Sequence, residues 1–220
     1  MTVCFATEIV TASASAVAAN ESASKIVLGK EVSADTVRQE APDALVIAVG
    51  GKPVLPDIKG IDGANVKDVS AVDRGDVETG AKVVVCGAGL SGTECALQLA
   101  MEGKEVTLVD ILPEEKFYDD ISQFCKPTIA RMLKENNVKL MPECAVTEFT
   151  ADSVVVKNAA GESVKIPCDT AVAAFGIEPN EKVVAELCEI IPETQIIGDA
   201  VKAGMIGDAI GNAFWFTMEI

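Results

Sequence analysis

The chain has 220 residues and a formal net charge of −16, which leaves no broad basic surface to bind a nucleic acid or an anionic membrane. It contains no histidine, and this excludes Ser-His-Asp and Cys-His catalytic arrangements and every metal site with a histidine ligand. The length is sufficient for one large domain or two small ones.

Seven cysteines are scattered along the chain without a C-x-x-C pair. This spacing indicates neither a zinc site, an iron–sulfur cluster nor a local redox disulfide, so no metal site is predicted. Dispersed cysteines of odd number are typical of buried thiols in a reducing compartment, and the expected location is cytoplasmic. No apolar run is long enough for a membrane span, so no membrane partner is expected.

The first 81 residues predict short strands, one helix and loops. In chain order we expect a strand at 3–10, a loop or weak helix at 11–24, a strand at 25–28, a short helix capped by Ser33 or Asp35, and a buried strand at 44–49. Gly50, Gly51, Pro53 and Pro56 end that strand and mark a crossover. A polar linker or short helix follows at 67–81.

The stretch KVVVCGAGLSGTECALQLAMEGKEVTLVD, residues 82–110, predicts a strand, a glycine turn, a helix and a second strand. In its G-x-G-x-x-G motif, Gly87 permits a tight turn, Gly89 lets backbone amides approach a pyrophosphate, and Gly92 allows close helix–strand packing. The helix N-terminus adds a partial positive charge. The predicted dinucleotide-binding loop comprises Gly87, Ala88, Gly89, Leu90, Ser91 and Gly92.

Asp110 ends the second strand, near the spacing at which a carboxylate binds the ribose 2′-hydroxyl of NAD. The next residues are Ile111 and Leu112, at positions where a protein that binds the 2′-phosphate of NADP would be expected to have arginine. The sequence therefore favours NAD(H) over NADP(H). The alternative is that the glycines serve packing alone. Cys86, directly before the loop, is expected to be a buried strand residue, although a thiolate near a helix N-terminus would be reactive.

The remaining residues alternate between helical and strand patterns. We expect a helix over 113–137 with an internal Pro127, a strand at 138–143, a three-stranded meander at 145–150, 152–157 and 163–167, and a buried strand at 170–174. Gly176 and Pro179 stop that strand, and the tail is expected to form a helix, a short strand, a Gly-Asp turn and a final apolar helix. The expected fold class is α/β, with a Rossmann-like parallel sheet and a β-meander.

Four ordered motifs in this chain resemble those of the pyridine-nucleotide-dependent flavoprotein reductases, in which an NAD domain is inserted into an FAD domain. The exit motif A-T-G-x-x-P is matched by Ala48, Val49, Gly50 and Pro53, with Val49 departing from threonine. The motif G-x-G-x-x-G-x-E of the NAD domain is matched by Gly87, Gly89, Gly92 and Glu94. The return motif A-x-G-x-x-P-N is matched by Ala174, Gly176, Pro179 and Asn180, and the motif G-D-A by Gly198, Asp199 and Ala200. The resemblance implies that Gly50, Gly176, Gly198 and Asp199 belong to cofactor sites and that Glu94 lies near the nicotinamide. As an alternative, Asp199 caps a helix.

The branch that this chain resembles is the C-terminal part of old yellow enzyme-like NADH:flavin oxidoreductases, such as 2-enoate and 2,4-dienoyl-CoA reductases. Disulfide reductases fit less well, because their C-x-x-x-x-C pair is missing. The family's FAD domain opens with a strand–glycine–helix unit of its own, whereas Gly29 is the only glycine before Gly50 in this chain. The resemblance therefore implies FAD in the parent enzyme but argues against a complete FAD site in this chain.

We accordingly expect residues 1–78 to be the N-terminal remnant of a truncated FAD-type domain, 79–176 the inserted NAD-binding domain, and 177–220 the returning FAD-type segment. The expected function is a dinucleotide-binding module that delivers hydride from NADH to FAD. This step needs no side-chain acid or base, so no catalytic residue is predicted. The expected partners are the upstream FAD and flavin-barrel domains of the parent protein. A homodimer and a non-catalytic nucleotide-sensing module remain the alternatives.

Overall fold

The computed structural model describes residues 3–6, 25–119 and 121–218, and these form two compact units. Unit 1 comprises residues 1–52 and 178–220, and unit 2 comprises residues 53–177. The chain passes from one unit to the other twice, within the short strands β4 (Gly51–Pro53) and β13 (Ile177–Pro179). These two strands pair with each other. Gly50 and Gly176 follow the ends of the preceding strands as predicted, but no sequence pattern indicated the paired strands that come after them.

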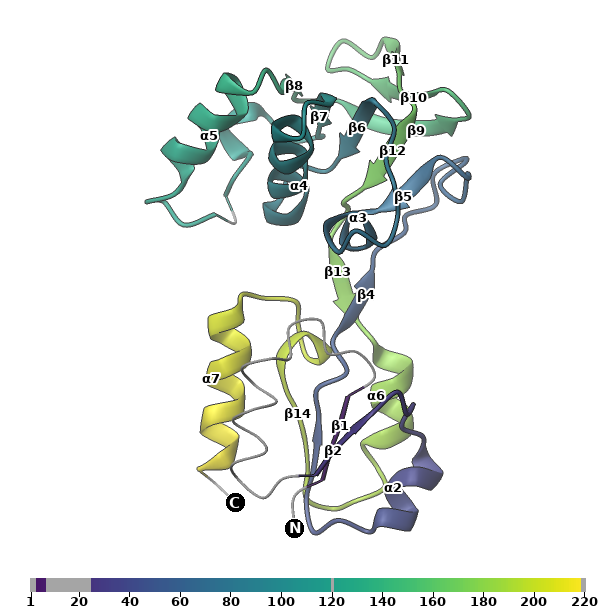
Figure 1. Ribbon diagram of the computed structural model, residues 1–220, viewed down its shortest axis with the longest axis vertical. Coiled ribbons are helices and arrows are strands. Elements are labelled where there is room, and N and C mark those ends of the chain that lie inside the picture. Colours follow the sequence, from purple (N-terminus) through teal and green to yellow (C-terminus); the bar gives the residue numbers. More distant parts are fainter. Residues whose placement is uncertain (1–2, 7–24, 120, 219–220) are drawn as a thin grey trace. The chain divides into compact units, whose positions relative to one another are not determined.

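Unit 2 is built on a parallel five-stranded sheet in the order β5-β12-β6-β7-β8 (Figure 1). Its strands are β5 (Val66–Asp68), β6 (Lys82–Cys86), β7 (Glu105–Val109), β8 (Lys139–Met141) and β12 (Thr170–Ala173). Its helices are α3 (Val69–Asp73), α4 (Leu90–Met101), α5 (Lys126–Glu135) and the 3-10 turn η1 (Glu114–Lys116). The predicted strand–glycine turn–helix–strand unit at 82–110 and the α/β fold class are confirmed.

Both faces of this sheet are buried, because successive side chains of a strand point to opposite faces. In β6, Val83 and Val85 pack in one cluster with residues of α3, α4 and α5. Val84 and Cys86 pack in a second cluster with Phe149 and other residues of the meander. The apolar run VVVC therefore forms a strand that is covered on both sides.

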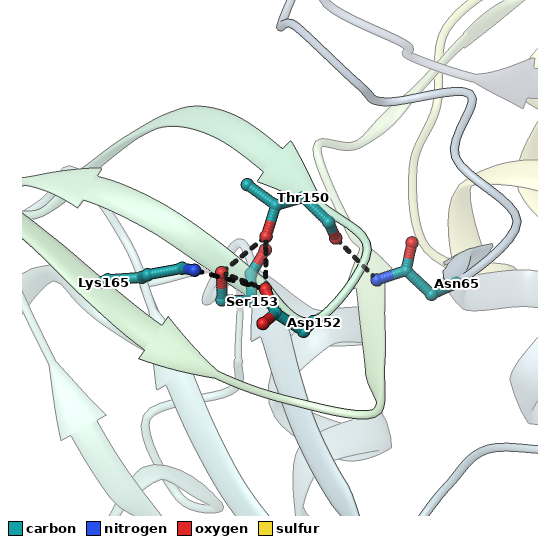
Figure 2. A network of polar contacts seen from close by, with 5 residues as sticks. All are labelled: Asn65, Thr150, Asp152, Ser153 and Lys165. Atoms are coloured by element: carbon teal, nitrogen blue, oxygen red, sulfur yellow. Dashed lines mark hydrogen bonds and ion pairs between the residues drawn. The ribbon is translucent and has the colours of Figure 1, made fainter.

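The meander consists of β9 (Ala145–Thr150), β10 (Ser153–Lys157) and β11 (Ser163–Pro167), in agreement with the prediction to within one residue. Polar contacts hold its first turn (Figure 2). Asp152 accepts hydrogen bonds from Thr150 Oγ1 at 2.9 Å and Ser153 Oγ at 3.2 Å, and its carboxylate lies 3.3 Å from Lys165 Nζ. Asn65 Nδ2 donates to the Thr150 carbonyl at 2.9 Å, which ties this turn to the segment before β5.

Three predictions about element length are wrong. The strand expected at 138–143 is shorter, β8 (Lys139–Met141). The helix expected over 113–137 begins only at Lys126, because Pro127 lies in its first turn, where the missing N–H of proline has no helical partner to lose. The strand expected at 44–49 is shorter, β3 (Leu45–Ile47), and only partly buried: Ile47 lies in the core, whereas Val46 is 43% exposed.

Unit 1 contains two pairs of parallel strands and three helices within its described part. The strands are β1 (Val3–Ala6), β2 (Lys25–Leu28), β3 and β14 (Thr194–Ile196); the helices are α2 (Ala34–Glu40), α6 (Glu181–Leu187) and α7 (Ile206–Thr217), with a 3-10 turn η2 (Gly198–Ala200). Ser33 Oγ accepts from the Thr36 amide at 3.3 Å, so Ser33 rather than Asp35 caps α2. Residues 7–10 of the first expected strand and the loop or weak helix expected at 11–24 lie outside the described residues.

Of the six cysteines whose side chains are described, Cys86, Cys95, Cys144 and Cys168 are buried, and none of the six is paired. In the described part of the chain, no helix combines the length and hydropathy needed to cross a bilayer. The same part of the chain contains no group of three or more acidic or cysteine side chains arranged to hold a metal ion.

Candidate functional site

The turn after β6 requires glycine at its first position. Gly87 has φ +114°, a conformation that residues with a side chain rarely adopt. A Cβ atom at Gly87 would lie 2.1 Å from the carbonyl oxygen of Ala174, which follows β12. The backbone of two neighbouring strands can approach this closely only because Gly87 has no side chain.

Gly92 is required for a different reason, since it lies in the first turn of α4. A Cβ atom there would lie 2.0 Å from the carbonyl oxygen of Gly87. The glycine therefore lets the start of α4 rest directly on the turn that precedes it.

The start of α4 leaves backbone donors free. Gly89 is the N-cap residue and provides no side-chain cap. Within the described residues, the amides of Gly89, Leu90, Ser91 and Gly92 donate no hydrogen bond, as is usual for the first turn of a helix. Ser91 and Glu94 are exposed on this helix, and no ion pair of Glu94 is present in the described part of the chain. Four of the six predicted loop residues, Gly89 to Gly92, therefore form a cluster of unsatisfied N–H groups at the positive end of a helix dipole.

Asp110 lies beside the same turn, although it is 22 residues from Ala88 in sequence. Its Oδ2 accepts the Ala88 N–H at 2.6 Å, and its Oδ1 accepts the Leu112 N–H at 2.8 Å. Ile111 and Leu112 are exposed apolar residues next to it. The structure thus brings the carboxylate and the glycine turn together, and it adds a role in turn geometry that the sequence did not suggest.

The order of the strands places this cluster at a topological switch point. From β6 the chain proceeds through α4 to β7 and β8 on one side, whereas β12 and β5 lie on the other side of β6. The residues at the carboxyl ends form one row in the order Asp68, Ala173, Cys86, Val109 and Met141. In open parallel sheets, ligands bind just outside such a row where the strand order reverses.

Asp68, at the end of this row, was not expected from the sequence to belong to the site. Its Oδ1 caps α3 by accepting the Ser70 and Ala71 amides at 3.0 and 3.2 Å. Its Oδ2 is buried and has no hydrogen-bond partner among the described residues. From the sequence, a carboxylate directly before a short helix could have been recognised as a helix cap. Its place in the row of residues at the carboxyl ends of the strands could not.

Cys86 is fully buried at the end of β6. Burial, together with the nearby Cys168, raises the pKa of its thiol. A buried thiol of raised pKa stays protonated, so the structure supports the buried strand residue and not the reactive thiolate.

Gly50, Gly198 and Asp199 lie in unit 1, around a hollow of about 290 Å³ that is also lined by Met205 and Ile206. Asp199 Oδ1 accepts the Gly204 N–H at 3.1 Å, whereas α7 is capped through Asp208, whose Oδ2 accepts the Met205 N–H at 2.9 Å. The helix-capping alternative for Asp199 is therefore wrong. Gly176, by contrast, is in unit 2 with φ +97° and open space where a Cβ would be, and it directly precedes β13.

The residues present fit the two expected cofactors unequally. At the carboxyl ends of its strands, unit 2 has free amides, a tight glycine turn and a carboxylate, which match the pyrophosphate and ribose of a dinucleotide. The hollow in unit 1 is at the small end of ligand pockets, and the described part of this unit contains no second glycine-rich strand-to-helix turn. The described part of unit 1 therefore fits FAD less closely than unit 2 fits a pyridine dinucleotide.

Comparison with known proteins identifies relatives over most of the chain. A family model described as pyridine nucleotide-disulphide oxidoreductase matches residues 5–201. A bilirubin reductase from Mediterraneibacter gnavus is 33% identical over 188 residues, covering 85% of this chain and 29% of the relative. A cinnamate reductase from Clostridium sporogenes is 29% identical over 197 residues, covering 86% of this chain and 28% of the relative.

A solved structure of 2-naphthoyl-CoA reductase in complex with 2-naphthoyl-CoA superposes with a TM-score of 0.88 at 31% identity, covering 93% of this chain and 31% of that one. The chain thus spans less than a third of the length of these relatives. The expected resemblance to reductases of the enoate type is confirmed. The chain belongs to the pyridine nucleotide-disulphide oxidoreductase family, whose members bind pyridine nucleotides and FAD.

Proposed function

We propose that this chain is the NAD(H)-binding module of a flavin-dependent oxidoreductase of the enoate or dienoyl reductase type. The observation that carries the proposal is the group of free amides at residues 89–92, which lies beside Asp110 at the switch point of the parallel sheet. The chain has a net charge of −16, so a dinucleotide pyrophosphate has to be bound by local donors rather than by the overall field. The helix N-terminus supplies those donors.

In the proposed complex each residue has a defined task. The amides of Gly89, Leu90 and Ser91 donate to the pyrophosphate, and Asp110 accepts a hydroxyl of the adenosine ribose. Glu94, exposed on the next turn of α4, faces the nicotinamide end. When bound, NADH supplies the hydride and FAD accepts it, and the side chains of this module orient the dinucleotide without acting as acid or base.

We further propose that NAD(H) is preferred over NADP(H). The carboxylate of Asp110 would repel a 2′-phosphate, and the adjacent Ile111 and Leu112 offer no cation to bind it. The proposal also includes a cytoplasmic location, in keeping with the unpaired cysteines, and FAD and flavin-barrel domains as partners in the parent protein.

A nucleotide-binding module without electron transfer is the second candidate. The observation in its favour is the less close fit of FAD to the described part of unit 1. An absorbance spectrum of the purified chain before and after addition of NADH distinguishes the two. A flavin band bleached by NADH supports electron transfer, whereas NADH binding without any flavin band supports the second candidate.

The binding site itself is tested by isothermal titration of NADH into Asp110→Ala. We expect affinity to fall about 10- to 100-fold, because a charge-assisted ribose contact and the bond to Ala88 are both lost. Asp62→Ala, which removes an exposed carboxylate elsewhere in unit 2, is the matched control and should bind like the unaltered chain. Equal affinity of Asp110→Ala and the unaltered chain would refute the assigned site.

A further inference from the structure

Two consecutive peptide groups of the glycine loop are held in different ways. The Gly87–Ala88 peptide places its carbonyl against Gly92 and donates its N–H to Asp110 Oδ2 at 2.6 Å. The carbonyl of the next peptide, Ala88–Gly89, accepts a hydrogen bond from the Thr93 hydroxyl at 3.1 Å. The N–H of that second peptide belongs to Gly89 and has no partner among the described residues.

The Thr93 hydrogen bond determines where the Gly89 N–H points. A trans peptide is planar, so its C=O and N–H point in opposite directions, and the described chain has no cis peptide. Thr93 is completely buried, and the carbonyl that it binds therefore points toward the interior. Gly89 is only partly buried, and its N–H consequently points away from the interior, toward the side from which a ligand approaches.

We propose that Thr93 is a positioning residue that aims the Gly89 amide at the dinucleotide pyrophosphate. This inference rests on the proposed function of the loop. Thr93 lies inside the protein and does not reach the ligand; it acts through the Ala88–Gly89 peptide.

The contact differs from the usual bond of a buried threonine. In a helix interior, threonine hydroxyls commonly bond to the carbonyl one turn earlier in the same helix. Here the acceptor is five residues earlier and precedes the helix, which begins at Leu90. The Gly92 amide, which would be the regular helical donor to the Ala88 carbonyl, makes no such bond, so the hydroxyl replaces it. Without Thr93 the peptide loses the partner that fixes its orientation.

The test uses three variants of the full chain and isothermal titration with NADH and with ADP-ribose, which has the pyrophosphate but no nicotinamide. Thr93→Val keeps the shape and removes the hydroxyl, and Thr93→Ser keeps the hydroxyl. Thr170→Val is the matched control: Thr170 is also buried in unit 2, and its Oγ1 accepts the Gly80 N–H at 3.0 Å, away from the loop. Thermal unfolding of each variant separates loss of stability from loss of binding.

We expect Thr93→Val to lower the affinity for both ligands about tenfold, as for the loss of one buried hydrogen bond. Thr93→Ser should bind both ligands with an affinity within about twofold of that of the unaltered chain. Thr170→Val should lower the melting temperature without changing either affinity. If Thr93→Val binds both ligands like the unaltered chain, or if Thr170→Val weakens them equally, the positioning role is overturned while the proposed function stands. If the unaltered chain binds neither ligand, the proposed function fails and the inference fails with it.

Discussion

The two units differ in how completely their apolar residues are buried. In unit 2 the parallel sheet has a buried cluster on each face, which together include Val83, Val85, Leu108 and Phe149. In the described part of unit 1 the cluster has three buried residues, Val37, Ile47 and Leu187, and the hydrophobic residues packed against them are only partly buried. In α7, Ile206, Ile210, Phe214 and Trp215 are all more than half exposed, and so is Met218 at its C-cap.

This difference in packing bears on how firmly each unit can hold the residues of a ligand site in place. A ligand site needs backbone and side chains held by packing around them. The glycine loop of unit 2 rests on such packing, because Gly87 and Gly92 contact backbone atoms directly. In the described part of unit 1 the cluster of buried residues is smaller, and it includes neither Gly198 nor Asp199. We therefore expect unit 2 to retain its geometry in conditions that disturb unit 1.

The largest expected effect comes from adding one methyl group to the glycine turn. Gly87→Ala would place a Cβ 2.1 Å from a backbone oxygen in a strained conformation, and we expect a loss of about 4 kcal/mol in unfolding free energy and no measurable NADH binding. Denaturant unfolding and titration check both. The control in unit 1 is Gly211→Ala in α7, where nothing lies within 4 Å and alanine should stabilise the helix by about 1 kcal/mol. Equal unfolding curves for Gly87→Ala and the unaltered chain would contradict the tight turn.

A smaller effect is expected from side-chain truncation in the two units. Leu108→Ala in β7 removes a completely buried side chain and should cost about 3 kcal/mol. Trp215→Ala removes a much larger side chain, yet one that is 70% exposed, and should change stability by less than about 0.5 kcal/mol. Chemical denaturation of both variants gives the comparison. A cost for Trp215→Ala as large as that for Leu108→Ala would show that the two units are packed alike.

The smallest effect is expected at alkaline pH. Burial raises the pKa of the Cys86 thiol above its ordinary value of 9.0, and burial followed by the charges of Asp169 and Asp152 raises the pKa of Cys168 to about 11. Above pH 9 the unfolded chain loses these protons while the folded chain keeps them, so folding stability is full below pH 9 and decreases as pH rises toward 11.

The expected slope is at most about 1.4 kcal/mol per pH unit for each thiol, measured by urea unfolding between about pH 8 and pH 10.5. A variant with Cys86→Ala and Cys168→Ala should be less stable at pH 8 but should lose the part of the slope that these thiols cause. Both thiols belong to unit 2, so the pH dependence should be seen in that unit. An unchanged slope in the double variant would show that other groups cause it.

Sequence patterns predicted the local structure of the glycine turn and the meander well, because the signal there is local. The spacing of Gly87, Gly89 and Gly92 between an apolar strand and an apolar helix predicted the loop, and the position of Asp110 predicted a nearby carboxylate. The meander strands were predicted to within one residue by their alternation and turn residues. These features depend on residues that are close in sequence, so they can be recognised without a structure.

Other features of the site were not predictable because they depend on segments that meet only in the fold. The Ala174 carbonyl lies against Gly87 because β12 pairs with β6, and no local pattern contains that pairing. In the sequence Thr93 cannot be told from an ordinary helix residue, and only its hydrogen bond to the Ala88 carbonyl in the structure distinguishes it. Asp110 was expected as a ribose ligand, yet its bond to Ala88 became visible only in three dimensions.

Local periodicity, turn chemistry and motif spacing were sufficient to predict most strands and helices along the chain, the glycine turn and the family resemblance. Three further properties depend on the folded arrangement: which strand lies beside β6, which side chains of α7 are uncovered, and in which direction the Gly89 amide points. These properties arise from packing and hydrogen bonds between distant segments, and the same local sequence would be compatible with several such arrangements.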